Sequence, residues 1–391
     1  MTTLTSAILT GTACDQYLSR SSFVAAIVRF EVALARAQAA IGLVPADTAE
    51  AIAAAARDVN LDLDRIASKG HETGTPVVEI VAQLGAGVEE RSEGAARFVH
   101  VGATSQDALD TAMVLCVKPC VELAIASLVA SRAAAFDLAR KYAGSPVLAR
   151  TLMQAAGVTT FGAKAANWGL ALGRCEKRLR DAAAEGLHVQ LGGPIGTGAA
   201  FGDRWPDVRT AVARELGLGA GPPGTWQSAR DAWTNLLMQL GLATGFAAKI
   251  AGDLALMSQT EVGEVRDPSS DEGVSSAMPH KRNPVWCLRI LSCGHVVEGL
   301  AAGLLSTIAV EQERGLGTWQ AELAMTPPLV SYTASALGTL APLLRGLHFD
   351  AERANRNIEA ARSVFGAGFD ERSQIDAATR AVECMLKEDK P

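Results

Sequence analysis

Long helical segments dominate this sequence and restrict the possible folds more than any other feature. Apolar residues recur at helical spacing in six segments, at 23–41, 104–143, 158–184, 228–257, 284–312 and 320–345. Most of these segments are at least twice as long as the usual globular helix of about 11–12 residues. Strand signals are scarce, and no Asn-Gly hairpin turn occurs. We therefore predict an all-α protein built on an elongated helical bundle.

The helical pattern predicts three parts along the chain. They are a small N-terminal helical domain at 1–105, a central bundle at 106–345 with a chemically rich loop at 264–284, and a short C-terminal helical segment at 346–391. Helices that are apolar on more than one face would expose too much apolar surface in a lone bundle. We therefore expect a homo-oligomer.

Three local signals predict where the long helices begin or bend. Thr104 to Asp107 reads T-x-x-D, a variant of the capping box, so a helix should begin here. Asn283 precedes Pro284, which predicts an N-cap followed by proline at the first helical position. Pro119 should kink or divide the second segment, because proline removes a backbone donor from a helix.

Composition and charge limit the classes of partner that the protein can bind and indicate its cellular compartment. The net charge of −6 argues against nucleic acid or an anionic membrane as the main partner, although a few local cations would suffice for a small anionic substrate. The N-terminus lacks the basic region of a signal peptide, and no run approaches the ~20 apolar residues of a spanning helix. The seven dispersed cysteines form no CxxC pair, which is typical of reduced thiols. We expect a cytoplasmic protein.

The loop before the fifth helical segment carries the densest set of reactive side chains. It reads GVSSAMPHKRNP from Gly273 to Pro284. Lys281 and Asn283 near a helix N-terminus would favour a carboxylate, because the terminal N–H groups and the helix dipole also favour an anion. A serine here could exchange a proton with a carbon beside that carboxylate if neighbours stabilise the alkoxide. From composition alone, an ordinary inter-helical loop with an Asn-Pro cap is the simpler interpretation.

This loop resembles the fumarase/aspartase superfamily signature G-S-S-x-M-P-x-K-x-N. Every specified position from Ser275 through Asn283 matches, and the departure is Val274, where the family has glycine. Valine is stiffer than glycine and does not readily adopt positive φ. The resemblance implies that Ser275 is the catalytic base and that Lys281 and Asn283 hold a substrate carboxylate. It also implies that Ser276 and Met278 contact the substrate.

Two further motifs resemble the same superfamily. Residues 100–107 read HVGATSQD, which is similar to the family's H-x-G-x-T-S-Q-D at the start of a core helix. The resemblance implies that Thr104 and Ser105 bind carboxylate, while His100 either orients the substrate and relays a proton or is a satisfied structural group. Residues 313–322 read ERGLGTWQAE and imply that Arg314 holds a carboxylate, in a bidentate manner.

A fourth region indicates a branch of the superfamily. Residues 150–154 read RTLMQ, where adenylosuccinate lyases read R-T-H-G-Q, so that Leu152 replaces their general-acid histidine. The muconate cycloisomerase branch resembles this chain in reading R-T-L-x-Q. The resemblance also implies that Gln154 and Trp168 contact the substrate, with Trp168 against a flat diene. Gln227 is a departure, because the branch has histidine in its W-H-T-x-R-D element.

The resemblance, which covers about residues 20–350, implies a cofactor-independent cycloisomerase. Its reaction would close 3-carboxy-cis,cis-muconate to a lactone in the protocatechuate branch of the β-ketoadipate pathway. Its substrate would be a small di- or tricarboxylate, and a sulfonate could replace the 3-carboxylate. It implies a homotetramer with shared active sites. The chain has no Walker-type loop and no convincing metal cluster, so we expect neither cofactor nor metal.

Two alternatives stay open at this level. The first is a β-eliminating lyase similar to adenylosuccinate lyase, which the absence of histidine at Leu152 disfavours. The second is a non-catalytic scaffold that retains the fold. The presence of Ser275, Lys281, Asn283 and Arg314 disfavours this scaffold.

Overall fold

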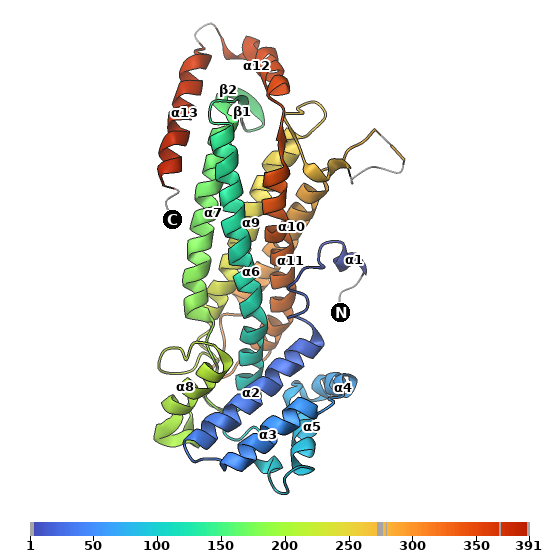
Figure 1. Ribbon diagram of the computed structural model, residues 1–391, viewed down its shortest axis with the longest axis vertical. Coiled ribbons are helices and arrows are strands. Elements are labelled where there is room, and N and C mark those ends of the chain that lie inside the picture. Colours follow the sequence, from blue (N-terminus) through green and yellow to red (C-terminus); the bar gives the residue numbers. More distant parts are fainter. Residues whose placement is uncertain (1–3, 272–276, 279, 367–368, 389–391) are drawn as a thin grey trace.

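Five long helices run side by side and form the body of the molecule in the computed structural model (Figure 1). The structure describes residues 4–271, 277–278, 280–366 and 369–388. The five helices are α6 (Ser105–Lys141), α7 (Phe161–Gly186), α9 (Asp231–Met257), α10 (Val285–Ser306) and α11 (Thr318–Gly346). Their facing sides share one apolar core, which includes Phe136, Leu240 and Leu340. The predicted all-α bundle is confirmed.

The lower end of the bundle in Figure 1 is covered by shorter helices. From the N-terminal part of the chain come α2 (Arg20–Ala40), α3 (Ala46–Asp58), α4 (Leu63–Thr73), α5 (Val77–Glu89) and η1 (Ala96–Phe98), whereas the one-turn α1 (Leu4–Ala7) lies beside the middle of the bundle (Figure 1). Two later elements, η2 (Ala199–Arg204) and α8 (Trp205–Leu216), lie at the same end, and α8 packs against α2. The helices at this end therefore come from two separate parts of the sequence.

The upper end carries the β-structure that the structure describes, together with the C-terminal helices α12 (Ala351–Phe365) and α13 (Glu371–Lys387) (Figure 1). An antiparallel hairpin pairs β1 (Pro146–Thr151) with β2 (Gln154–Thr160), and a shorter pair joins β3 (Val265–Arg266) to β4 (His348–Phe349). The one-turn η3 (Pro268–Asp271) precedes the reactive loop. The predicted third helix therefore begins at Phe161, after the hairpin, and not at Val158.

Close packing explains where the hairpin stops and α7 begins. A side chain at Gly162 would meet the backbone of Ala143 at 2.6 Å, so only glycine fits at this crossing. Phe161 stacks on Phe349, with ring centroids 4.6 Å apart, and Thr160 caps α7 by accepting from the N–H of Ala163. These contacts account for the T-T-F-G segment as a structural element.

The structure corrects the predicted start of α10. Pro284, not Asn283, precedes the helix, and it makes no side-chain cap. The first backbone donors are satisfied from a distant segment: the N–H of Trp286 donates to Ser269 Oγ and the N–H of Cys287 to Asp267 Oδ2. The anion at this helix N-terminus is therefore the protein's own Asp267 carboxylate.

Proline does not divide the long helices. α6 continues through Pro119, and α11 through Pro327 and Pro328. An interior proline costs a helix ~3 kcal/mol, and packing of these helices on several neighbours outweighs that cost. The predicted capping box at the start of α6 is confirmed, because Asp107 accepts a hydrogen bond from the N–H of Thr104.

Three described helices are long and apolar enough to cross a membrane, by length and composition alone, although the sequence predicted no spanning helix. They are α6, α9 and α10, and the share of their most apolar windows that is buried is 50%, 44% and 28%. The remainder leaves large apolar side chains on the surface, among them Leu123, Val129, Leu242, Leu288 and Leu305. The bundle therefore carries apolar faces that a single chain does not cover.

Candidate active site

The N-terminus of α6 lies against an arginine from the segment before α11. Arg314 Nη2 donates to Thr104 Oγ1 at 2.8 Å and to the carbonyl oxygen of Pro194 at 3.2 Å. Three loops, around 100–104, 191–198 and 311–317, meet at this point. A guanidinium beside hydroxyls at a helix N-terminus is suited to binding a carboxylate. Ser105, which begins α6, is partly exposed here.

Asp107 holds two of these loops together. Its buried carboxylate accepts backbone hydrogen bonds from Thr104 at 3.0 Å, Gly192 at 3.0 Å and Gly193 at 2.8 Å. Burial raises the pKa of Asp107 to about 7, against the lowering effect of the three N–H donors. The aspartate of the T-S-Q-D motif therefore fixes the position of the loop beside Thr104.

His100 is oriented by a buried glutamate. Its Nδ1 lies 2.7 Å from Oε1 of Glu31, and the His100 side chain is 18% exposed while that of Glu31 is fully buried. Burial lowers the pKa of His100, but the hydrogen bond and charge of Glu31, with the charge of Asp107, outweigh burial and shift it upward. His100 also has a positive φ of 64°. An imidazole fixed in this way can present its other nitrogen to a ligand in one orientation.

Gln227 links the start of α6 to the segment that carries Arg314. Gln106 Nε2 donates to the carbonyl oxygen of Gln227 at 2.9 Å, and Gln227 Nε2 donates to the carbonyl oxygen of Glu313 at 2.7 Å. Gln106 and Gln227 are buried. The sequence marked Gln227 only as a departure from the W-H-T-x-R-D pattern, and this link depends on contacts that no spacing reveals.

A buried ionic cluster, further inside the bundle than these loops, holds three helices together. Arg230, at the start of α9, donates to Asp110 of α6 at 2.6 Å and also pairs with Glu322 of α11. Burial raises the pKa of Asp110 to about 6, and the charge of Arg230 opposes that shift. The arginine also lies over the ring of Trp226, 4.5 Å from its centroid. Its members are 92 and 120 residues apart along the chain, so no local motif indicates the cluster.

The second group of motif residues lies at the upper end of the bundle. An open cavity of about 920 Å³ is lined there by polar and charged side chains, including Arg266, His280, Lys281, Asn283, His348 and Asp350. Lys281 and Met278 are exposed. The predicted Ser275 and Ser276, and the departure at Val274, lie outside the described residues.

The tip of the β1–β2 hairpin lies at this upper end. Leu152 and Met153 are 96% and 72% exposed, and they have φ values of 50° and 64°. Two consecutive non-glycine residues in the left-handed region are strained, and such strain is concentrated at functional sites. Gln154 follows them and is also exposed. Below the tip, Arg150 pairs with Glu264 at 2.7 Å and holds the hairpin on the bundle.

Trp168 lies inside the bundle. The ring is 2% exposed, packs edge-on against Phe161 with centroids 6.0 Å apart, and donates from Nε1 to Asp253 Oδ2 at 3.2 Å. Within one chain, Trp168 therefore fills the core and not the wall of an open cavity.

One chain does not bring the two groups of motif residues together. Thr104 lies at the N-terminus of α6, and the hairpin follows its C-terminus (Figure 1). The 37 residues of α6 span about 55 Å at ~1.5 Å per residue. We call the group around Thr104, Arg314 and His100 the Thr104 end, and the group around Lys281, Asn283 and the hairpin tip the Lys281 end. Among the described residues, no set of three His, Cys, Asp or Glu side chains is placed to hold a metal ion.

Comparisons with known proteins identify relatives that match most of the chain. A family profile described as Lyase matches residues 10–299. The 3-carboxy-cis,cis-muconate cycloisomerase of Bradyrhizobium diazoefficiens is 37% identical over 86% of this chain and 75% of the relative. The protein of the same name from Pseudomonas aeruginosa is 39% identical over 84% and 72%. Nitrosuccinate lyase of Streptomyces davaonensis is 39% identical over 91% and 77%.

The fold of this chain is also similar to the solved structures of related enzymes. The crystal structure of β-carboxy-cis,cis-muconate cycloisomerase from Acinetobacter calcoaceticus has a TM-score of 0.85 and 31% identity, covering 99% of this chain and 90% of the other. A fumarate lyase from Mesorhizobium has a TM-score of 0.81 and 32% identity, covering 98% and 88%.

Proposed function

The chain belongs to the lyase family of the fumarase/aspartase superfamily, and from this membership we propose that it is a 3-carboxy-cis,cis-muconate cycloisomerase. The observation that carries the proposal is the likeness to cycloisomerases at 37% and 39% identity over most of the chain. The leucine at position 152 supports it, because a leucine cannot serve as the general acid that an adenylosuccinate lyase has at this place.

The reaction is an intramolecular addition. A carboxylate oxygen of the muconate attacks the conjugated double bond and forms the C–O bond of a five-membered lactone. The displaced electron pair moves to the carbon beside another carboxylate and is delocalised into it, and this carbon then accepts a proton. One carboxylate becomes a neutral ester, so each turnover takes up one proton. Groups that bind the charge more tightly as it develops supply the catalysis.

The two ends have complementary roles in this proposal. Thr104, Ser105 and Arg314 hold one carboxylate, and the Glu31–His100 pair orients it or relays a proton. Lys281 and Asn283 hold a second carboxylate, and Ser275 transfers the proton to carbon. We assign substrate contacts also to Ser276, Met278 and Gln154. Trp168, which the resemblance placed against the substrate, is buried in the core and bonded to Asp253, so we give it no substrate contact. The reaction needs no cofactor, because these groups supply both charge stabilisation and the proton.

We further propose a homotetramer in which each active site combines residues of different copies. The two ends lie at opposite ends of α6, so a site that contains both requires a neighbouring copy with its bundle antiparallel (Figure 1). The outward apolar faces of α6, α9 and α10 offer the surface for this packing. Leu316 beside Arg314 is 96% exposed and Leu152 is 96% exposed, which supports contact between these ends in an assembly. We place the enzyme in the cytoplasm and in the protocatechuate branch of aromatic degradation.

The test follows diene absorbance and proton uptake together, with EDTA-treated enzyme and 3-carboxy-cis,cis-muconate. We expect the diene band to disappear with one proton taken up per molecule, unaffected by EDTA. Ser275→Ala and Lys281→Ala should be slower by at least a hundredfold, while Lys177→Ala, an exposed lysine on α7, should match the wild type. A wild-type enzyme that leaves the diene band unchanged would refute the assignment.

Shared sites can be tested by mixing inactive variants. Ser275→Ala removes a group at the Lys281 end, and Arg314→Ala removes one at the Thr104 end. If each site combines two copies, assemblies formed from both variants contain some sites with neither change, so activity should return. If each chain holds a complete site, the mixture should stay as inactive as its parts.

The likeness to nitrosuccinate lyase favours a second candidate, the β-elimination of a small leaving group from a substituted succinate. This reaction passes through the same type of stabilised carbanion, but it releases fumarate. The appearance of fumarate from nitrosuccinate, with the muconate diene unchanged, would favour this candidate over the cycloisomerase.

A further inference from the structure

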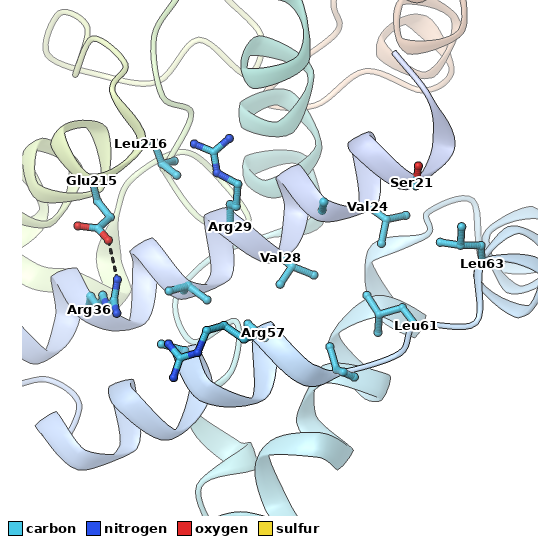
Figure 2. Close-up of a pocket in the computed structure, with 15 residues that line it drawn as sticks. Ser21, Val24, Val28, Arg29, Arg36, Arg57, Leu61, Leu63, Glu215 and Leu216 are labelled. Carbon is cyan, nitrogen blue, oxygen red and sulfur yellow. Dashed lines mark hydrogen bonds and ion pairs between the residues drawn. The ribbon is translucent and has the colours of Figure 1, made fainter. Parts of the chain in front are cut away.

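A cavity of about 570 Å³ lies between the N-terminal helices and the end of α8, and none of its lining residues belongs to the Thr104 end or the Lys281 end (Figure 2). One face of α2 forms its floor, and the end of α3, the loop after it and the end of α8 form its sides. The lining is mainly aliphatic and includes Val24, Val28, Val32, Leu61 and Leu216. Its volume lies within the ~300–1,000 Å³ of typical small-molecule sites.

Three arginines border this groove, and only one of them is neutralised. Arg36 pairs with Glu50 at 3.2 Å and with Glu215 at 2.8 Å. In the part of the chain that the structure describes, Arg29 and Arg57 make neither an ion pair nor a side-chain hydrogen bond. Figure 2 shows Arg29 extending from α2 on one side of Val28 and Arg57 from α3 on the other.

The neighbouring acids do not compensate these two charges. Glu50 and Glu215 are engaged by Arg36, and Asp58, beside Arg57, pairs with Arg91 at 2.9 Å. Asp62 accepts the first N–H groups of α4 as its N-cap. The groove therefore combines an apolar interior with two uncompensated guanidinium groups.

We propose that this groove binds a carboxylate carried on an apolar body, such as an aromatic acid. The aliphatic walls favour removal of an apolar ring from water, and a guanidinium is the side chain best matched to a carboxylate. A neutral ligand of the same shape lacks the charge-assisted contact. A polar tricarboxylate such as the proposed substrate is disfavoured, because it has more carboxylates than the groove has uncompensated arginines and it offers the aliphatic walls no apolar surface to bury.

The site is tested by calorimetric titration of the full-length protein with 2-naphthoate, and with 2-naphthamide as its neutral isostere. We expect 2-naphthoate to bind about tenfold or more tightly than the amide, the size expected for one charge-assisted hydrogen bond. Arg29→Gln and Arg57→Gln should each weaken the naphthoate by a similar factor. Arg178→Gln, which removes an exposed charge on α7 outside the groove, should leave the affinity unchanged.

A substitution that keeps all charges separates the groove from a general charge effect. Ala56→Phe places a ring in the open space between α2 and α3, so it should abolish naphthoate binding while the melting temperature stays near that of the wild type. Lys281→Ala should bind naphthoate as the wild type does, because Lys281 lies at the other end of the molecule.

Three results would overturn the proposal. The first is equal binding of acid and amide, and the second is binding that Ala56→Phe does not change. The third is a pair of observations: the wild type does not bind naphthoate, and Arg29→Gln sediments as a smaller assembly than the wild type does. This third result would mean that a second copy of the chain covers the groove.

Discussion

Oε1 of Glu31 and Nδ1 of His100 lie 2.7 Å apart, although 69 residues separate them along the chain. Glu31 projects from α2, and His100 stands in the loop before α6, so the contact ties the N-terminal helices to the candidate active site. Because the glutamate is buried, removing its charge changes the imidazole more than removing an exposed charge would.

Glu31→Gln should lower the pKa of His100 and make the protein less stable at acidic pH. The pKa of His100 is raised in the folded protein, so the stabilisation is fully present below the ordinary pKa of about 6.5 and is lost as the pH rises through the folded value. The difference in unfolding free energy between wild type and variant should therefore be larger at pH 5.5 than at pH 8.5. Urea unfolding at both values and NMR titration of the His100 ring measure it. A difference that does not change with pH would contradict the charged pair.

Gln227→Ala should impair binding at Arg314 without unfolding the protein. The substitution removes the donor to the carbonyl oxygen of Glu313, and a lost buried hydrogen bond costs about 1–3 kcal/mol. We expect kcat/KM to fall by roughly tenfold, mainly through a higher KM, because Arg314 is proposed to hold the substrate in both the ground and transition states. Gln227→His should restore most of this loss, since a ring N–H can replace the amide donor. Equal losses in both variants, or a fall in kcat alone, would exclude the positioning role.

Arg230→Met should be strongly destabilising, by about 3–5 kcal/mol, because it leaves two buried carboxylates without their cation. Arg180→Met is the matched control, since it breaks an exposed pair with Glu176 on α7 and should cost less than about 1 kcal/mol. Urea unfolding at pH 7 measures both. If the two variants lose the same stability, the buried cluster does not hold α6, α9 and α11 together.

Leu152→Gly should lower the activity of the enzyme without lowering its stability. Glycine relieves the positive φ of 50° at the hairpin tip, so the folded chain should keep its stability or gain up to about 1 kcal/mol. Activity on the muconate should nevertheless fall, because the apolar side chain proposed to enter a shared site is absent. Thermal melting and the diene assay on the same preparation test both parts. Unchanged activity would place Leu152 outside the site.

Local patterns in the sequence predicted much of the fold. Five of the six predicted helical segments correspond to α6, α7, α9, α10 and α11, and the first to α2. Periodicity succeeded because a long helix must bury a stripe of its own residues wherever it packs. The hairpin was missed because neither β1 nor β2 alternates buried and exposed residues with the period of two that indicates a strand. The predicted cap at Asn283 was wrong because Asp267 and Ser269, from outside the helix, satisfy the first donors of α10.

By itself, the sequence determined the helical class, the superfamily and the residue types of the reactive loops, because helical periodicity and contiguous motifs are local properties of a chain. Only the tertiary structure decided which groups meet. It paired Glu31 with His100, linked Gln227 to the Arg314 segment, closed the Arg230 cluster and placed the Thr104 and Lys281 ends far apart. Such contacts join residues tens to hundreds of positions apart, and their partners are selected by how the helices pack, which spacing along the chain does not encode.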